Sequence, residues 1–164
     1  MSRPQVMPKA KKCIYIGLSC LLLAFFGASH AQHNHSHGAP PTDTRVVVDF
    51  PPAMKEHTLS SMRDHLLAIS QIQEAIGNAK YDVAASIAET RLGQTALKAH
   101  HAKENSAFMP TGMQELGTQM HRNASKFAIE IQTASATGDI KPALLLLSKT
   151  TQACVACHAG YKLK

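Results

Sequence analysis

The feature that most constrains this chain is a five-residue motif near its C-terminus, Cys154-Val155-Ala156-Cys157-His158. Two thiols three residues apart on a helix lie on one face, where both can add to the vinyl groups of one porphyrin as thioethers. The imidazole that follows directly can then ligate the iron as its proximal ligand. The motif therefore predicts a covalently bound haem c, attached through Cys154 and Cys157, with His158 on the iron.

Other uses of a C-x-x-C pair fit this chain less well. A redox-active dithiol of the thioredoxin type needs a strand–helix–strand context, which this segment lacks. A zinc site needs a second pair of ligands at a suitable spacing. The other two cysteines, Cys13 and Cys20, lie in a segment that we expect to be removed. A structural dithiol or a zinc pair at Cys154 and Cys157 is the weaker alternative.

The first 31 residues have the three parts of a secretory signal peptide. Residues 1–12 carry four basic residues and no acid, an apolar stretch runs from about Cys13 to Ala28, and a cleavage position follows at Ala31. The apolar stretch is shorter than the roughly 20 residues of a membrane-spanning helix, which favours cleavage over anchoring. Because haem is attached to such motifs on the outer side of the bacterial inner membrane, we expect a periplasmic protein.

Removal of the signal peptide changes the charge balance. The whole chain has 17 Lys and Arg against 11 Asp and Glu, and four of the bases lie in the signal peptide. The nearly neutral remainder gives no reason to expect a nucleic-acid partner. A mild positive field would suit an acidic redox partner. The mature chain is long enough for a single domain with one core.

Residues 32–51 are polar and interrupted by prolines, which predicts a flexible lead with a short extended piece at Val46–Val48 that docks on the body. Three alternating histidines in this lead, His33, His35 and His37, could bind copper or nickel weakly, because imidazole suits both ions. We favour the interpretation that the segment is a solvated linker, because its composition is that of a loop.

From residue 52 onward the apolar residues recur at steps of three and four, which predicts four helices over about 53–76, 82–100, 111–137 and 140–161. We expect Asp82 and Asp139 to cap the second and fourth helices, and Gly138 to end the third. Four amphipathic helices with short loops predict an all-α, antiparallel four-helix bundle over residues 52–164.

The expected inward stripes place the motif inside this bundle. The haem attached to the C-terminal helix would then replace side-chain packing rather than lie on the surface. The stripe on the first helix is Leu59, Met62, Leu66, Ile69, Gln73 and Ile76; that on the third is Met113, Leu116, Met120, Phe127, Ile131 and Ala134; that on the fourth is Leu144, Leu147, Thr151, Cys154, His158 and Tyr161.

Residues 154–162 follow a C-x-x-C-H-x-x-aromatic-basic pattern, and looser matches lie at 80–82 and 137–140. In these segments the chain resembles class II c-type cytochromes, the cytochrome c′ family and its low-spin relatives. The resemblance covers residues 52–164 and implies a four-helix bundle with His158 as the proximal ligand. It suggests Lys162 as a basic residue of the haem pocket. It also implies that the first helix supplies the distal side, with an apolar residue in gas-binding members and a methionine in low-spin electron carriers.

The distal ligand is expected near the end of the fourth helix, where an antiparallel bundle also brings the starts of the first and third. Met62 is the best candidate, because it lies on the inward stripe and about twenty residues before the second helix, as in the low-spin relatives. The alternatives are Met62 as core packing, bis-histidine ligation through His65, and an open face beside Leu66. Further residues in range are Met54, His57, Met113, Met120 and His121.

Two other groups of residues bear on the site. His100, His101 and His121 could assemble a metal site, but they lack the i,i+4 spacing of ligand pairs, so we expect them at the surface or at the haem edge. Arg63 and Arg122 are candidates to bind a haem propionate through charge-assisted hydrogen bonds. In the resembled family that arginine lies four residues before the distal ligand, where this chain has Thr58.

The sequence thus predicts a periplasmic monohaem electron carrier whose iron is held by His158 and Met62. The alternative is a five-coordinate haem protein that binds NO or CO. A catalyst is disfavoured, because peroxidase-type chemistry needs positioned acid–base groups beside an open iron. The expected partners are periplasmic redox proteins, and a homodimer is left open.

Overall fold

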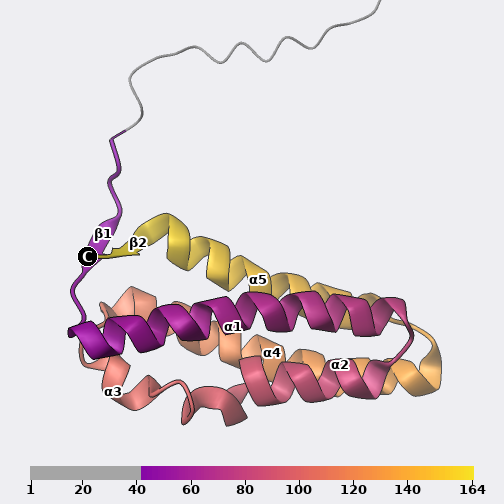
Figure 1. Cartoon of the computed structure of the whole chain (residues 1–164). Helices are drawn as coiled ribbons and strands as arrows, with labels where there is room; N and C mark the ends of the chain where they lie inside the picture. The colour runs from indigo at the N-terminus through magenta and orange to yellow at the C-terminus, as the bar shows by residue number, and fades with distance from the viewer. Residues whose placement is uncertain (1–41) are drawn as a thin grey trace, which may run out of the picture. The chain divides into compact units, whose positions relative to one another are not determined.

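The computed structural model describes residues 42–164, so the predicted signal peptide and the three alternating histidines lie outside the described residues. Over residues 42–164 the chain is 76% helical, which confirms the all-α class. None of the helices in this range is long and apolar enough to cross a membrane. In chain order the elements are β1 (Val46–Val48), α1 (Pro52–Gly77), α2 (Tyr81–Ile87), the π-helical turn η1 (Ala88–Leu92), the 3₁₀ turn η2 (Gln94–Leu97), α3 (Ala102–Ser106), α4 (Thr111–Thr137), α5 (Lys141–Gly160) and β2 (Tyr161–Leu163) (Figure 1).

Three of the four predicted helices are confirmed as α1, α4 and α5. A proline lies in the first turn of α1, where its missing N–H would have no partner within the helix. Gly138 ends α4 in the left-handed conformation with φ of 75°, as predicted. α5 begins after Ile140, and the Asp139 carboxylate accepts a hydrogen bond from the backbone N–H of Lys141 at 3.0 Å. Asp139, which was predicted to be the N-cap, thus lies one position before the observed N-cap Ile140 and still satisfies an N–H of the first turn.

The predicted helix over 82–100 is wrong in its second half and at its cap. α2 begins at Tyr81, with Lys80 rather than Asp82 at the N-cap, and the helical path ends with η1. Gly93 then takes an extended backbone, with φ of −76° and ψ of −175°. The short turns η2 and α3 replace the rest of the expected helix.

The break at Gly93 has a local cause in Glu89. The Glu89 carbonyl accepts hydrogen bonds from the Thr95 hydroxyl at 2.7 Å and from the Gly93 N–H at 3.2 Å. Its carboxylate accepts the Thr95 N–H at 3.1 Å. A Cβ on residue 93 would lie 2.5 Å from this carboxylate, so only glycine allows the chain to pass so close. The chain therefore turns away from α2 instead of continuing as a helix.

The long helices pack side by side, with α4 against α5 and α2, and α2 against α1 (Figure 1). Their main core combines many alanines, such as Ala68 and Ala143, with a few large side chains around Phe127. Small residues at the contacts let the helix backbones approach closely. Several residues of the predicted stripes lie outside this core. Leu66 is 71% exposed and Leu144 is 42% exposed, and Gln73 and His158 are exposed as well, so their predicted inward positions are wrong.

The two strands join the segment before α1 to the tail after α5. β1 pairs in parallel with β2, with Val46 opposite Tyr161 and Val48 opposite Leu163. The Lys164 N–H donates to the Val48 carbonyl at 3.0 Å and extends the pairing. Val48 and Phe50 are buried and form a second, smaller core with Met113, Tyr161 and Leu163 among its members. The extended piece predicted at Val46–Val48 is thus present and docks on the C-terminal tail.

Candidate functional site

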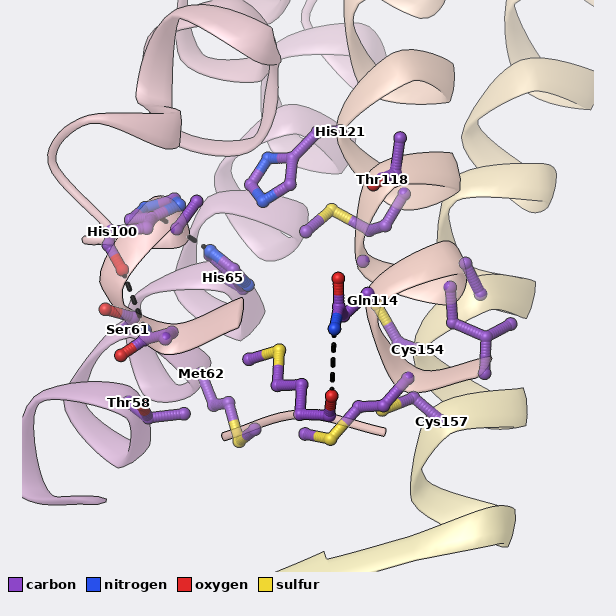
Figure 2. Close-up of a pocket in the computed structure, with 18 of the residues that line it drawn as sticks. Thr58, Ser61, Met62, His65, His100, Gln114, Thr118, His121, Cys154 and Cys157 are labelled. Atoms are coloured by element: carbon purple, nitrogen blue, oxygen red, sulfur yellow. Dashed lines mark hydrogen bonds between the residues drawn. The ribbon is translucent and has the colours of Figure 1, made fainter. Parts of the chain in front are cut away.

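A cavity of about 220 Å³ lies where α1 and α4 begin and α5 ends. Its walls come from α1, from the irregular segment between η2 and α4, from α4 itself and from α5 (Figure 2). It separates the main core from the smaller one, since Cys154 packs against the first and Cys157 against the second. The interior of the protein is therefore interrupted at the C-terminal motif.

All three motif residues predicted to hold a haem line this cavity. Cys154 and Cys157 are half-buried free thiols on one side of α5. Burial raises the pKa of both thiols, so they are protonated at neutral pH. His158 is exposed and also lines the cavity. The motif thus presents two thiols and an imidazole to one space.

Four methionines contribute thioethers to the rest of the cavity. Met62 reaches it from α1, on the side opposite the two cysteines (Figure 2). Met113 and Met120 line it from α4, as the topology argument allowed, and Met109 joins them from the segment before α4. Met109 was missed, because it belongs to no helical stripe. Met54, by contrast, packs against the smaller core.

A second cavity of about 360 Å³ shares Met62, Cys157 and His158 with the first and has a basic rim. The rim consists of Lys162, which the family resemblance suggested, together with Arg45 and Lys55, which were not predicted. Each of these side chains makes a hydrogen bond to another part of the chain. Lys162 Nζ donates to the Asp43 carboxylate at 3.0 Å, and Arg45 donates to the His158 carbonyl at 3.4 Å. Lys55 donates to the Lys164 carbonyl.

The two arginines proposed from the sequence for a propionate lie elsewhere. Neither Arg63 nor Arg122 contributes to the two cavities formed by residues 42–164. Arg63 pairs with Glu56 at 3.6 Å on the surface, and the side chain of Arg122 is exposed. The positive charge beside the motif therefore comes from Arg45 just before β1, from Lys55 in the first turn of α1 and from Lys162 in β2. The Asp43 carboxylate pairs with two of these side chains, Arg45 and Lys162.

Three histidines from three segments meet at the inner end of the first cavity (Figure 2). His65 of α1 and His100 of the segment after η2 bring their Nε2 atoms to 3.4 Å. The ring of His121, on α4, lies 5.4 Å from that of His100 and 6.1 Å from that of His65, between ring centroids. Of the two expected locations, the surface is excluded for His121, which is buried, and for His100, which is half-buried; both line the cavity that the motif faces, so a position at the haem edge stays a prediction. His101 is exposed, and its ring contacts that of His57 edge-on.

The break in the second predicted helix helps to orient His121. Its Nδ1 lies 2.7 Å from the Leu92 carbonyl and 3.2 Å from that of Gly93. Because a carbonyl only accepts hydrogen bonds, Nδ1 carries the proton and Nε2 has a free lone pair. Burial lowers the pKa of His65 to about 4, with a further contribution from the charges of His100 and His121. Burial also lowers the pKa of His100 and His121, so all three rings are neutral at pH 7.

The chemistry of the lining suits a flat apolar ring that carries carboxylates. Thioether side chains supply apolar walls, the thiol pair supplies attachment points, and the basic rim suits anionic groups. Among the described residues, buried polar atoms of Thr58, His100 and Asn105 in the lining have no hydrogen-bond partner. Across residues 42–164 no group of three or more His, Cys, Asp or Glu side chains is arranged, as the side chains stand, so that it could hold a metal ion.

A comparison of the chain with protein-family models, with curated protein sequences and with solved structures finds no match in any of the three.

Proposed function

We propose that this protein is a periplasmic electron carrier, a monohaem c-type cytochrome with the haem held in an antiparallel four-helix bundle of α1, α2, α4 and α5. One observation carries the proposal. Met62 and the motif residues Cys154, Cys157 and His158 line the same cavity, although about ninety residues separate Met62 from the motif. Two thiols, an imidazole and a facing thioether are the side chains that hold a low-spin haem c.

The protonated thiols suit covalent attachment. Each thiol adds its sulfur to one carbon of a vinyl group and its proton to the other, so the bond forms without an oxidant. Cys154 and Cys157 lie on one side of α5, which lets a single porphyrin receive both sulfurs. The structural alternative of a zinc pair would need further ligands beside these thiols.

The remaining residues fit ligation and potential control. His158 would be the proximal ligand and Met62 the distal one, and a methionine ligand raises the reduction potential and closes the iron to gases. The apolar thioethers around the ring would favour the oxidation state of the iron in which the haem has the lower net charge. Arg45, Lys55 and Lys162 form the rim where the propionates would find charge-assisted hydrogen bonds.

The test starts from the full chain, produced in a bacterial periplasm together with the haem maturation machinery. We expect the processed protein to carry the added mass of one haem, and its ferrous form to show six-coordinate low-spin absorption bands. Met62→Ala should convert the spectrum to high-spin and allow rapid CO binding. Met120→Ala, which truncates another methionine of the same cavity, should leave the protein low-spin and is the matched control.

Three outcomes would contradict parts of this proposal. A processed chain without added haem mass would remove the cytochrome assignment. A wild-type ferrous protein that is high-spin and binds CO rapidly would replace electron transfer by gas binding. A low-spin spectrum that survives Met62→Ala but not His65→Ala would transfer the distal role to His65.

A further inference from the structure

The spacing of His65 and His100 matches that of two ligands on one metal ion. Nitrogen ligands lie about 2.0–2.1 Å from zinc, and at a tetrahedral angle two of them are about 3.3–3.4 Å apart. The Nε2 atoms of His65 and His100 are 3.4 Å apart. Two imidazoles from different segments thus already have the separation that a shared zinc ion requires.

His121 has the hydrogen bond that a third ligand usually has. Metal-binding histidines commonly donate their other ring N–H to a carbonyl or carboxylate, which fixes the ring and leaves one nitrogen for the metal. The Nδ1–H of His121 does this with the Leu92 carbonyl at 2.7 Å. Its ring lies 5.4 Å from that of His100 and 6.1 Å from that of His65, so the three side chains are not yet arranged as a site, and His121 would have to turn toward the other two to supply the third nitrogen.

The protonation state of the cluster suits a metal ion. The three rings are neutral at pH 7, which is the form that ligates metals. The Asp64 carboxylate acts to raise the pKa of His65 and His100, whereas the Arg91 guanidinium, which donates to it from Nε at 3.0 Å, acts to lower the pKa of His65; the charge beside the cluster is therefore that of an ion pair.

We propose that His65, His100 and His121 bind one zinc ion at the inner end of the cavity, with the fourth coordination position open to the cavity. This inference goes beyond the proposed electron transfer, because the cluster uses neither the motif nor Met62; the two share one cavity, and both hold only if the distal haem ligand is not His65. Three histidines with an open fourth position are a common zinc arrangement.

The binding test uses the haem-loaded full chain in which His33, His35 and His37 are replaced by serine, so that the N-terminal histidines cannot contribute. Zn²⁺ alone is titrated by calorimetry and in competition with a coloured zinc chelator. We expect one ion per chain with a dissociation constant of micromolar or below. His100→Ala and His121→Ala should each weaken binding at least tenfold. His101→Ala removes an exposed neighbouring imidazole and should leave the affinity unchanged.

X-ray absorption at the zinc edge identifies the ligands directly. We expect a first shell of nitrogen and oxygen near 2.0–2.1 Å with the outer-shell pattern of imidazole, and no sulfur near 2.3 Å. Absence of saturable binding at one equivalent, a loss in His101→Ala equal to that in His121→Ala, or a sulfur shell would each overturn the proposal. Haem content is read separately from the optical spectrum, so failure of the zinc site and failure of the cytochrome assignment are distinguishable.

Discussion

The docking of β1 on the tail gives a matched pair of substitutions. Val48 is 3% exposed and packs in the smaller core, whereas Val47, next to it on the same strand, is 52% exposed. Val48→Ala removes two buried methyl groups, and the lost apolar burial lowers the free energy of unfolding by about 0.8 kcal/mol for each. The space left behind adds a further cost, so we expect a loss of about 2 kcal/mol in the free energy of unfolding. Val47→Ala should change it by less than about 0.5 kcal/mol.

Urea unfolding of the full chain, followed by far-ultraviolet circular dichroism, measures both values. The two variants lose the same strand propensity, so the difference between them reports burial alone. Equal slopes against urea would show that neither variant alters the surface exposed on unfolding. If the two variants are destabilised to within about 0.5 kcal/mol of each other, Val48 does not pack as described and the reasoning about β1 fails.

Three further predictions test other parts of the structure by the same unfolding assay. Phe127→Ala empties a fully buried position and should lower the free energy of unfolding by about 3–5 kcal/mol. Phe108→Ala, at a side chain that is 44% exposed, should lower it clearly less. Similar losses in the two variants would contradict the described core. Ala79 has φ of 54°, so Ala79→Gly should stabilise the protein by up to about 1 kcal/mol, and a destabilised variant would refute the left-handed conformation. The pKa of His65 is about 4 in the folded protein and about 6.5 in the unfolded chain, so the unfolded state binds more protons between these two pH values. The contribution of His65 to stability is therefore complete above pH 6.5 and should be lost as the pH drops through 4, by at most about 3 kcal/mol. A pH dependence that is undiminished in His65→Asn would disprove this origin.

Large apolar residues made α4 predictable from the sequence. The predicted stripe residues Met113, Met120 and Phe127 are all buried, because each large side chain needs the core and the helix places them on one side. The stripes of α1 and α5 were less accurate. Their buried faces are formed partly by Ala68 and Ala143, and alanine gives little signal in a hydrophobic pattern.

The break after η1 was not predictable from periodicity. It depends on the Glu89 side chain folding back to Thr95, and on Gly93 allowing the close approach. Apolar spacing carries no information about such hydrogen bonds. A glycine in a helical pattern was the available sign, and it is compatible with an uninterrupted helix as well.

The candidate site was predictable where a local motif defined it. Cys154 and Cys157 lie on one side of α5 because of their spacing alone, and Met62 was found from the helical stripe. The histidine cluster was not predictable in this way. Its members come from three segments, and the position of His100 depends on the irregular path that follows the unpredicted break.

The strand pairing also sets an order for events during synthesis. The ribosome makes β1 before the long helices and β2 after all of them, and their contact therefore closes a loop that contains nearly the whole described chain. Segments made early can associate while the chain is still being translated, but this contact must wait for the final residues. Whatever the order in which the helices associate, the two ends of the described chain can thus meet only once the last residues are free to reach β1.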